Sequence, residues 1–455
     1  MIVPGQRLII LSAAVLLPAS AMAAYAPAWM PAAIAAALVL AAVALVDAAS
    51  AGSRFKGIRV SAPAVVRMTV GRCADIPLII RKSREVSISM RIGLALPETL
   101  STDRNDRRAH LPAGVERKQT TWSCTAARRG RYPLGACLAE VPTRWGLWSA
   151  RRRFSLDGEI RAYPNLLSGQ KHVRGLFDRR ETGWRMMRKI GKGREFEQLR
   201  EYLPGDSFED IDWKATARRR HPITRTYQVE HSQEIYVILD ASRLSTRNVH
   251  YMKNRREHPR QSSGRGPSTI FERYIAAALV MAVAAERAAD RYGLLVFDDK
   301  PDCFVKAGKG IAHYNTCREV LYNRMPRQVS PAFDELFTFI GTHIRKRAML
   351  IFLTNLDDPL LSENFIDTMS IAADRHVLMV NMCRPPGAYP LFSSPEVNRV
   401  EDLYQHLAGH MLWSSLSDTR RKLRQYGAGF TLLEEDQLCS QLIGQYLEVK
   451  QRQML

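Results

Sequence analysis

The sequence predicts an α/β protein: a doubly wound, mostly parallel sheet, preceded by a small β-sandwich-like domain and an N-terminal hairpin of apolar helices. Three observations lead to this. Two apolar runs open the chain, short alternating segments follow to about residue 165, and strands alternate with helices from residue 234 onward. The last pattern is typical of a parallel sheet with helices on both faces. We therefore expect four regions: 1–53 (transmembrane hairpin), 54–165 (β-rich pre-domain), 166–233 (linker with a sequence signature) and 234–455 (α/β domain).

The hairpin consists of two uncharged, alanine-rich runs. Leu8–Ala24 lies at the short limit for a membrane-spanning helix, and Ala32–Val46 carries no charge until Asp47. Trp29 between the runs suits an interfacial turn, because its ring favours headgroup depth. A close-packed pair of helices is easier to sustain than two isolated spans of this composition.

A cleaved signal peptide is the alternative, since Ala21-Met22-Ala23 has the A-x-A form of a cleavage site. Only one charge, Arg7, precedes the first run, and a second apolar run follows at once, which favours the hairpin. Basic residues follow the second run at Arg54, Lys56 and Arg59. The positive-inside rule then places both ends in the cytoplasm and predicts a multi-pass membrane protein with the bulk of the chain cytoplasmic.

The pre-domain is indicated by short apolar runs broken by turn residues, at Ile76–Ile80, Val86–Leu96, Gly130–Leu138 and Glu159–Tyr163. The alternation within the second run is typical of a half-buried strand. No long amphipathic pattern interrupts this region, so a β-sandwich is expected.

The α/β domain is indicated by continuous apolar runs, which are typical of strands buried on both faces. Helical patterns separate them. The expected strands are Ile235–Leu239, Gly293–Phe297, Met349–Leu353, Val377–Val380 and Phe430–Leu433, and the expected helices are Ile270–Arg287, Phe333–Ile344 and Glu363–Ala373. In such a sheet, ligand sites lie at the carboxyl ends of the strands.

The net charge of +21 implies acidic partners: anionic lipid headgroups, nucleic acid or an acidic protein surface. A membrane protein gains from basic residues near the bilayer, which favours the lipid interpretation. Part of the charge lies in a basic segment, 246–268, expected to be an inserted loop. The seven cysteines show no C-x-x-C spacing, which argues against a disulfide framework and fits a reducing compartment.

The most specific segment reads FEQLREYLPGD at 196–206 and IDWKATAR at 211–218. It resembles the signature of the bacterial family called domain of unknown function 58. RGRYPLG at 129–135, WGLW at 145–148 and Tyr163-Pro164-Asn165 agree with that family in order. The resemblance implies a von Willebrand factor A-like domain, an inner-membrane location, and work alongside a MoxR-type AAA+ ATPase and a client protein. The signature residues are Arg200, Tyr202, Pro204, Gly205, Asp206, Asp212, Trp213, Lys214 and Arg218.

Two interpretations of the signature remain open. Pro204-Gly205-Asp206 is a turn signal. The charges at Asp212, Lys214 and Arg218 beside Trp213 could form a buried latch between domains, since buried charges need partners. They could instead form a partner-binding surface. Glu209 and Asp210 stand where many family members carry basic residues.

The resemblance also raises the question of a metal site. A-type domains that bind Mg²⁺ or Mn²⁺ carry Asp-x-Ser-x-Ser after the first strand, with a Thr from a second loop and an Asp after a later strand. This chain has Asp240 and Ser242, but Leu244 replaces the second hydroxyl and Ser245 comes one residue late. The residues that could form a degenerate metal site or a partner surface are Asp240, Ser242, Ser245, Ser330, Asn355 and Asp357. An octahedral ion needs near-ideal oxygen geometry, so we expect no cofactor and doubt even weak Mg²⁺ or Mn²⁺ binding. Asp240 would then pair with a base or cap the following segment.

No pattern indicates an enzyme. Glycine-lysine turns at 191–193 and 308–310 do not fit a phosphate-binding loop, and His406 and His410 lack the glutamate of H-E-x-x-H. The expected function is a non-enzymatic adaptor or assembly factor. The alternative is a membrane-tethered nucleic-acid binder using Lys253–Arg265, Arg218–Arg220 and Arg225; few aromatic residues accompany these bases, so nucleic acid is the less favoured partner.

Overall fold

The computed structural model describes residues 1–25, 29–83, 87–104, 106–166, 190–203, 207–228, 233–248, 269–391, 393, 400–434 and 437–452. These form two compact units, one comprising Met1–Pro164 and the other the described residues from Asn165 onward. Most of the predicted basic loop 246–268, and the signature residues Pro204, Gly205 and Asp206, lie outside the described residues.

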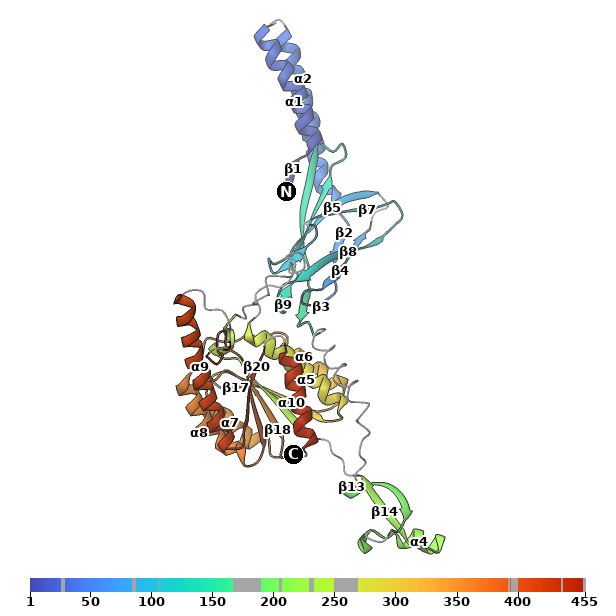
Figure 1. The fold of residues 1–455 in the computed structure, drawn as a ribbon. Coiled ribbons are helices and arrows are strands. Elements are labelled where there is room, and N and C mark those ends of the chain that lie inside the picture. Colours follow the sequence, from blue (N-terminus) through green and yellow to red (C-terminus); the bar gives the residue numbers. More distant parts are fainter. Residues whose placement is uncertain are drawn as a thin grey trace. The chain divides into compact units, whose positions relative to one another are not determined.

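The first unit begins with a short strand and two apolar helices, β1 (Ile2–Pro4), α1 (Gln6–Tyr25) and α2 (Met30–Arg54). The helices lie side by side (Figure 1). Among the described residues, α2 alone is long and apolar enough to cross a membrane, whereas the apolar stretch of α1, Gln6–Ala21, is shorter. The structure thus supports one candidate span near the N-terminus, and it does not support the multi-pass prediction.

The β-rich part of this unit is built from three sheets. A five-stranded sheet has the order β1-β11-β10-β5-β7, a four-stranded sheet the order β2-β4-β8-β6, and a three-stranded sheet the order β3-β12-β9. Inward side chains of all three sheets share one core, whose largest member is Trp122. The strands are β2 (Ile58–Ser61), β3 (Val65–Thr69), β4 (Cys73–Lys82), β5 (Ile88–Ala95), β6 (Leu100–Thr102), β7 (Arg107–Leu111), β8 (Arg117–Ala126), β9 (Gly130–Pro133), β10 (Ala136–Pro142), β11 (Trp148–Ser155) and β12 (Glu159–Tyr163).

Two features of this region differ from the sequence-based expectation. The run Gly130–Leu138 is two strands in two different sheets, because the chain changes sheets after Pro133, whose nitrogen cannot continue a ladder. The residues before the first apolar helix form β1, which pairs antiparallel with β11. A three-residue strand has too little periodicity to be predicted.

The signature segment forms a small substructure. β13 (Ile190–Glu201) and β14 (Ile223–Gln228) pair antiparallel and are joined through a 3₁₀ turn (Phe208–Asp210) and the short helix α4 (Trp213–Arg219). The Asp212 side chain caps α4 by accepting a hydrogen bond from the Ala215 amide at 2.9 Å.

The second unit contains a six-stranded sheet of order β17-β16-β15-β18-β19-β20. All pairs are parallel except that of β17 with β16. The strands are β15 (Glu234–Asp240), β16 (Arg291–Phe297), β17 (Pro301–Gly308), β18 (Met349–Leu353), β19 (Val377–Cys383) and β20 (Gly429–Leu433). All five predicted strands are present; the antiparallel edge strand β17 was not predicted, because its half-buried residues are mixed in polarity.

Helices cover both faces of this sheet (Figure 1). On one face, α5 (Ile270–Arg287), α6 (Ile311–Leu321) and α10 (Leu438–Gln451) pack on alternate strand residues such as Val237. On the other, α7 (Phe333–His343), α8 (Pro359–Ala373) and α9 (Val400–Gln425) pack on the intervening residues such as Ile238. This arrangement explains why the strands are apolar throughout.

Candidate functional site

The carboxyl edge of the sheet is centred on Asp240, the last residue of β15, whose side chain is fully buried. One carboxylate oxygen accepts a hydrogen bond from the Ser242 amide at 2.8 Å, and the other accepts one from the Thr354 hydroxyl at 2.6 Å. Burial raises the pKa of Asp240, although these hydrogen bonds oppose that shift. Asp240 therefore joins the end of β15 to the end of β18 and orders the segment that follows β15.

A second buried network lies beside it and is organised by Tyr274 of α5. Its hydroxyl lies 3.1 Å from the Asn355 side-chain oxygen and 3.3 Å from the Thr354 carbonyl, and it accepts a hydrogen bond from the Cys383 amide at 3.3 Å. The Asn355 side-chain nitrogen donates to the Leu244 carbonyl at 3.2 Å. One tyrosine thus ties α5 to the ends of β18 and β19 and, through Asn355, to the loop after β15.

The outer layer of this edge is made of arginine–carboxylate contacts. The Arg243 Nε donates to the Ser330 hydroxyl at 3.2 Å, and its guanidinium lies 3.8 Å from the Asp358 carboxylate. Arg247 forms an ion pair with Asp357. These arginines are about half exposed, so they, and not the buried Asp240, face solvent at the edge.

A third cluster lies at the end of β16. The Arg327 guanidinium contacts the buried Asp298 at 3.0 Å and Asp299 at 3.3 Å, and its amide donates to the Ala241 carbonyl. Burial would raise the pKa of Asp298, but its interactions with Asp299 and with the Arg327 guanidinium outweigh burial and lower the pKa. Asp298 is thereby held as a charged group close to the Asp240 loop.

The predicted site residues all lie at the carboxyl edge of the sheet. Ser330 and Asp357 are connected to it through contacts with Arg243 and Arg247. Asp240, Ser242, Ser245 and Asn355 are buried, so they can influence a partner only through the exposed groups that they hold. The Ser245 hydroxyl has no hydrogen-bond partner among the described residues. Sequence reasoning missed Tyr274, Arg247 and Asp298. The only available signal was that Asp298 directly follows a predicted strand.

The donor set at this edge fits a divalent ion poorly. Both Asp240 oxygens already accept protein hydrogen bonds, and two guanidinium groups neutralise Asp357 and Asp358. No group of three or more His, Cys, Asp or Glu with metal-binding geometry occurs among the described residues. Of the two roles considered for Asp240, pairing with a base is not seen among the described residues. Asp240 accepts from the Ser242 amide, and Ser242 in turn caps the 3₁₀ turn Arg243–Thr246.

An exposed apolar row lies on α9, next to the beginning of α8. Its members recur at helical spacing, and each is at least 46% exposed: Val400, Leu403, Tyr404, Leu407 and Met411. Met411 and Pro359 line the same hollow of about 410 Å³, and Leu360, the next residue of α8, is 77% exposed. We call these five residues with Leu360 the α9 row. An exposed apolar surface of this kind is typical of a protein-interaction site.

The signature segment also exposes apolar side chains. Phe208 is 75% exposed and Trp213 is 69% exposed, and Lys214 and Arg218 face solvent as well. Asp212 pairs with Arg225 of β14 at 2.9 Å, within the same segment. The hydrogen bond from the Ala215 amide contributes most to holding the pKa of Asp212 below its usual range, and the hydrogen bond from Arg225 contributes next.

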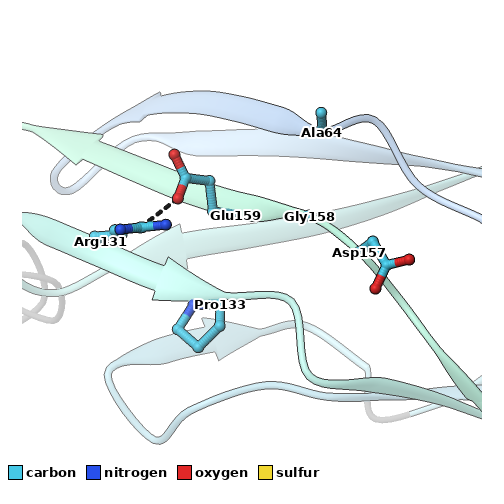
Figure 2. Close-up of a pocket in the computed structure, with 6 residues that line it drawn as sticks. All are labelled: Ala64, Arg131, Pro133, Asp157, Gly158 and Glu159. Atoms are coloured by element: carbon cyan, nitrogen blue, oxygen red, sulfur yellow. Dashed lines mark hydrogen bonds and ion pairs between the residues drawn. The ribbon is translucent and has the colours of Figure 1, made fainter.

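A further hollow, of about 500 Å³, lies in the β-rich unit (Figure 2). It is lined by Ala64, Arg131, Pro133, Asp157, Gly158 and Glu159. Glu159 points toward Arg131 across neighbouring strands and pairs with both Arg131 and Arg161. Its charged groups largely satisfy one another, and we assign no chemistry to it.

Comparisons with known proteins bear on the signature and the sheet together. No curated protein matches the chain. Among solved structures, a native alpha-2-macroglobulin of E. coli is 13% identical with a TM-score of 0.18, over 24% of this chain and 7% of that one. A CARDB domain from Pyrococcus furiosus is 15% identical (TM-score 0.15, 22% of this chain, 86% of that one), and a C. elegans MSP family member is 8% identical (0.17, 23% and 97%). The chain thus spans a small fraction of the first of these, and TM-scores this low do not indicate a shared fold. Residues 198–388, which run from the signature through most of the sheet, match the family described as "Protein of unknown function DUF58", and this supports membership of that family.

Proposed function

We propose that this protein is a membrane-anchored adaptor or assembly factor whose α/β unit is a von Willebrand factor A-like domain. Its partners would be a MoxR-type AAA+ ATPase and a client protein, as the family resemblance implies. The observation that carries the proposal is the α9 row, whose Met411 lines a hollow with Pro359, the residue after the Asp358 that lies beside Arg243. Apolar anchors beside a charged rim are the usual composition of a protein-binding surface.

The anchor we propose is a two-pass hairpin of α1 and α2 in the bacterial inner membrane, with the bulk of the chain in the cytoplasm. Pairing of β1 with β11 supports it, because the start of α1 and the end of α2 are then held by the same β-rich domain. Reporter fusions at the two termini test the topology. Equal cytoplasmic signals are expected, and a periplasmic signal from the N-terminal fusion would contradict it.

The adaptor role is tested by purifying the tagged protein from native membranes in mild detergent, with and without an ATP analogue. We expect an AAA+ ATPase to be retained in a nucleotide-dependent way. Leu407→Ser with Met411→Ser should reduce its recovery at least tenfold. Ile371→Ser is the matched control, since Ile371 is a 58% exposed apolar residue of α8 outside the row. Equal recovery of the ATPase with the wild type and all variants would show that the α9 row does not bind it.

We also propose that the carboxyl edge binds no divalent ion tightly, because arginines take the place of an ion beside Asp357 and Asp358. Titration calorimetry with Mg²⁺ and Mn²⁺ should show no saturable heat. Binding that disappears in Asp240→Ala would contradict this.

The second candidate function is nucleic-acid binding. Exposure of Trp213 beside Lys214 and Arg218 favours it, since aromatic rings among cations stack on single-stranded bases. A gel shift with single-stranded oligonucleotide at two salt concentrations separates the candidates. Retention at physiological salt, lost in Trp213→Ala, would favour nucleic acid over the adaptor role.

A further inference from the structure

The junction between the apolar helices and the β-rich domain is formed by the turn joining β10 to β11, Thr143–Leu147. Asp47 of α2 is buried, and its carboxylate accepts hydrogen bonds from the Thr143 hydroxyl at 2.5 Å and from the Trp145 and Leu147 amides, each at 3.1 Å. A carboxylate with three donors is a strong attachment, because hydrogen bonds to charged groups contribute more than neutral ones. The turn is therefore fixed to α2.

The same turn is fixed to the beginning of α1. The Gly5 amide donates to the Leu147 carbonyl at 2.7 Å, and the Arg7 guanidinium donates to the Trp145 carbonyl at 3.3 Å. The apolar run of the first helix begins directly after Arg7, and that of the second ends directly before Asp47. The turn thus lies at the level where both apolar runs end.

This level coincides with one boundary of a bilayer that the hairpin would span. From Trp29 to Asp47, α2 rises roughly 27 Å at 1.5 Å per residue, close to the hydrocarbon thickness of about 30 Å. Trp29 is 65% exposed at the far end of the helices, and Trp145 is 46% exposed at the near end. Two exposed indoles at this separation correspond to the two aromatic belts of a membrane protein.

The exposed charges at the near end are basic. Arg7 and Arg144 face solvent, and neither forms an ion pair with any residue that the structure describes. Asp47, the nearby carboxylate, is buried and fully used by the turn. At the level of Trp145, an indole ring suited to the membrane interface therefore lies with two arginines that form no ion pair with any described residue.

We propose that Trp145, Arg144 and Arg7 form a headgroup-binding surface that takes anionic phospholipid, with the indole at the interface and the guanidinium groups on phosphate. This inference rests on the proposed membrane hairpin and adds to it the lipid class and the contact residues. The β-rich domain is thereby held against the bilayer, because the turn that carries the surface is bonded to both helices.

The depth of Trp145 is tested with the full chain in phosphatidylcholine vesicles containing lipids brominated either near the headgroup or near the chain end. The fluorescence of Trp145 is obtained by subtracting the tryptophan emission of Trp145→Phe from that of the wild type. We expect it to be quenched mainly by the shallow bromines. The same difference for Trp122→Phe should show no quenching, since Trp122 is 2% exposed in the β-rich core. An unquenched Trp145 would overturn the surface.

The charge is tested by counting retained lipids by native mass spectrometry after exposure to equimolar phosphatidylglycerol and phosphatidylcholine. Arg144→Gln should lower the preference for phosphatidylglycerol about fivefold, as expected for one cation near an anionic surface. Arg153→Gln is the matched control, an exposed arginine of β11 further from the turn, and should retain the preference. Equal preference in wild type and Arg144→Gln would overturn the proposal.

Failure of the hairpin itself is distinguished by Trp29, whose emission is obtained in the same way with Trp29→Phe. Quenching of Trp29 without quenching of Trp145 means that the helices insert but the turn does not reach the interface. Absence of both signals means that the proposed membrane anchor is wrong.

Discussion

Asp47, within α2, and Asp240, the last residue of β15, are both buried carboxylates, but the protein uses them differently. Asp47 accepts hydrogen bonds from three groups of one turn about a hundred residues further along the chain. Asp240 accepts from its own loop and from the neighbouring strand, and burial leaves its pKa raised. The three donors offset the burial of the Asp47 charge, and Asp47 thereby joins α2 to the turn. For Asp240, two hydrogen bonds offset only part of the effect of burying the charge, so its pKa stays raised.

The largest loss of stability is expected at Asp47, whose buried charge accepts the most hydrogen bonds. Asp47→Ala leaves the Trp145 and Leu147 amides without the carboxylate that accepts from them, while the Thr143 hydroxyl keeps the Trp148 carbonyl as an acceptor. We expect a loss of about 3 kcal/mol in the unfolding free energy of the first unit. Thermal unfolding in detergent measures it. Asp47→Asn keeps one oxygen acceptor and should lose less. If both variants unfold at the wild-type temperature, the joint is not a stabilising contact.

The next largest effect concerns the network beside Asp240. Tyr274→Phe removes the hydroxyl that accepts a hydrogen bond from the Cys383 amide and lies 3.1 Å from the Asn355 side-chain oxygen. We expect this to cost about 2 kcal/mol in denaturant-induced unfolding. Tyr292→Phe is the control, because Tyr292 is equally buried but donates to one carbonyl, that of Ala278. A larger loss from the control would mean that the carboxyl edge is not organised by Tyr274.

A smaller effect, with a definite sign, is expected at Asp240. Its folded-state pKa is raised, so its contribution to stability is present below the unfolded value near 3.8 and is lost as pH rises through the folded-state value. Asp240→Asn should cost no more than about 1 kcal/mol at neutral pH, and the wild type should gain on the variant as the solution is acidified. Unfolding at neutral and at acidic pH checks this. A wild-type advantage that grows with rising pH would show a lowered pKa instead.

The smallest effect on folding is expected at the rim. Arg247→Gln removes a half-exposed ion pair with Asp357 and should change stability by less than about 1 kcal/mol. Under the adaptor proposal, Arg247→Gln should lower the recovery of the ATPase although the variant remains folded. Unchanged recovery would limit the partner surface to the α9 row.

Much of the α/β unit was predictable, because continuous apolar runs such as Met349–Leu353 admit few structures other than a doubly covered strand. The carboxyl-edge residues were predicted from the resemblance to A-type domains, whose metal motif follows parallel strands that end at one edge. The exposed α9 row was not predicted. Its spacing is the same as that of a core-facing stripe, and a periodic apolar pattern does not reveal whether anything covers it.

The order of apolar helices, β-rich region and mixed sheet follows from the sequence, which also contains the signature that the family match supports. The sequence also shows that the Asp-x-Ser-x-Ser pattern after β15 is incomplete, because Leu244 stands at the position of the second hydroxyl. Tertiary structure alone decided which groups meet: Asp47 with the turn before β11, Tyr274 with Asn355, and Arg247 with Asp357. The physical reason is that these contacts join residues far apart in the chain, where hydrogen-bond geometry depends on packing and leaves no local pattern in the sequence.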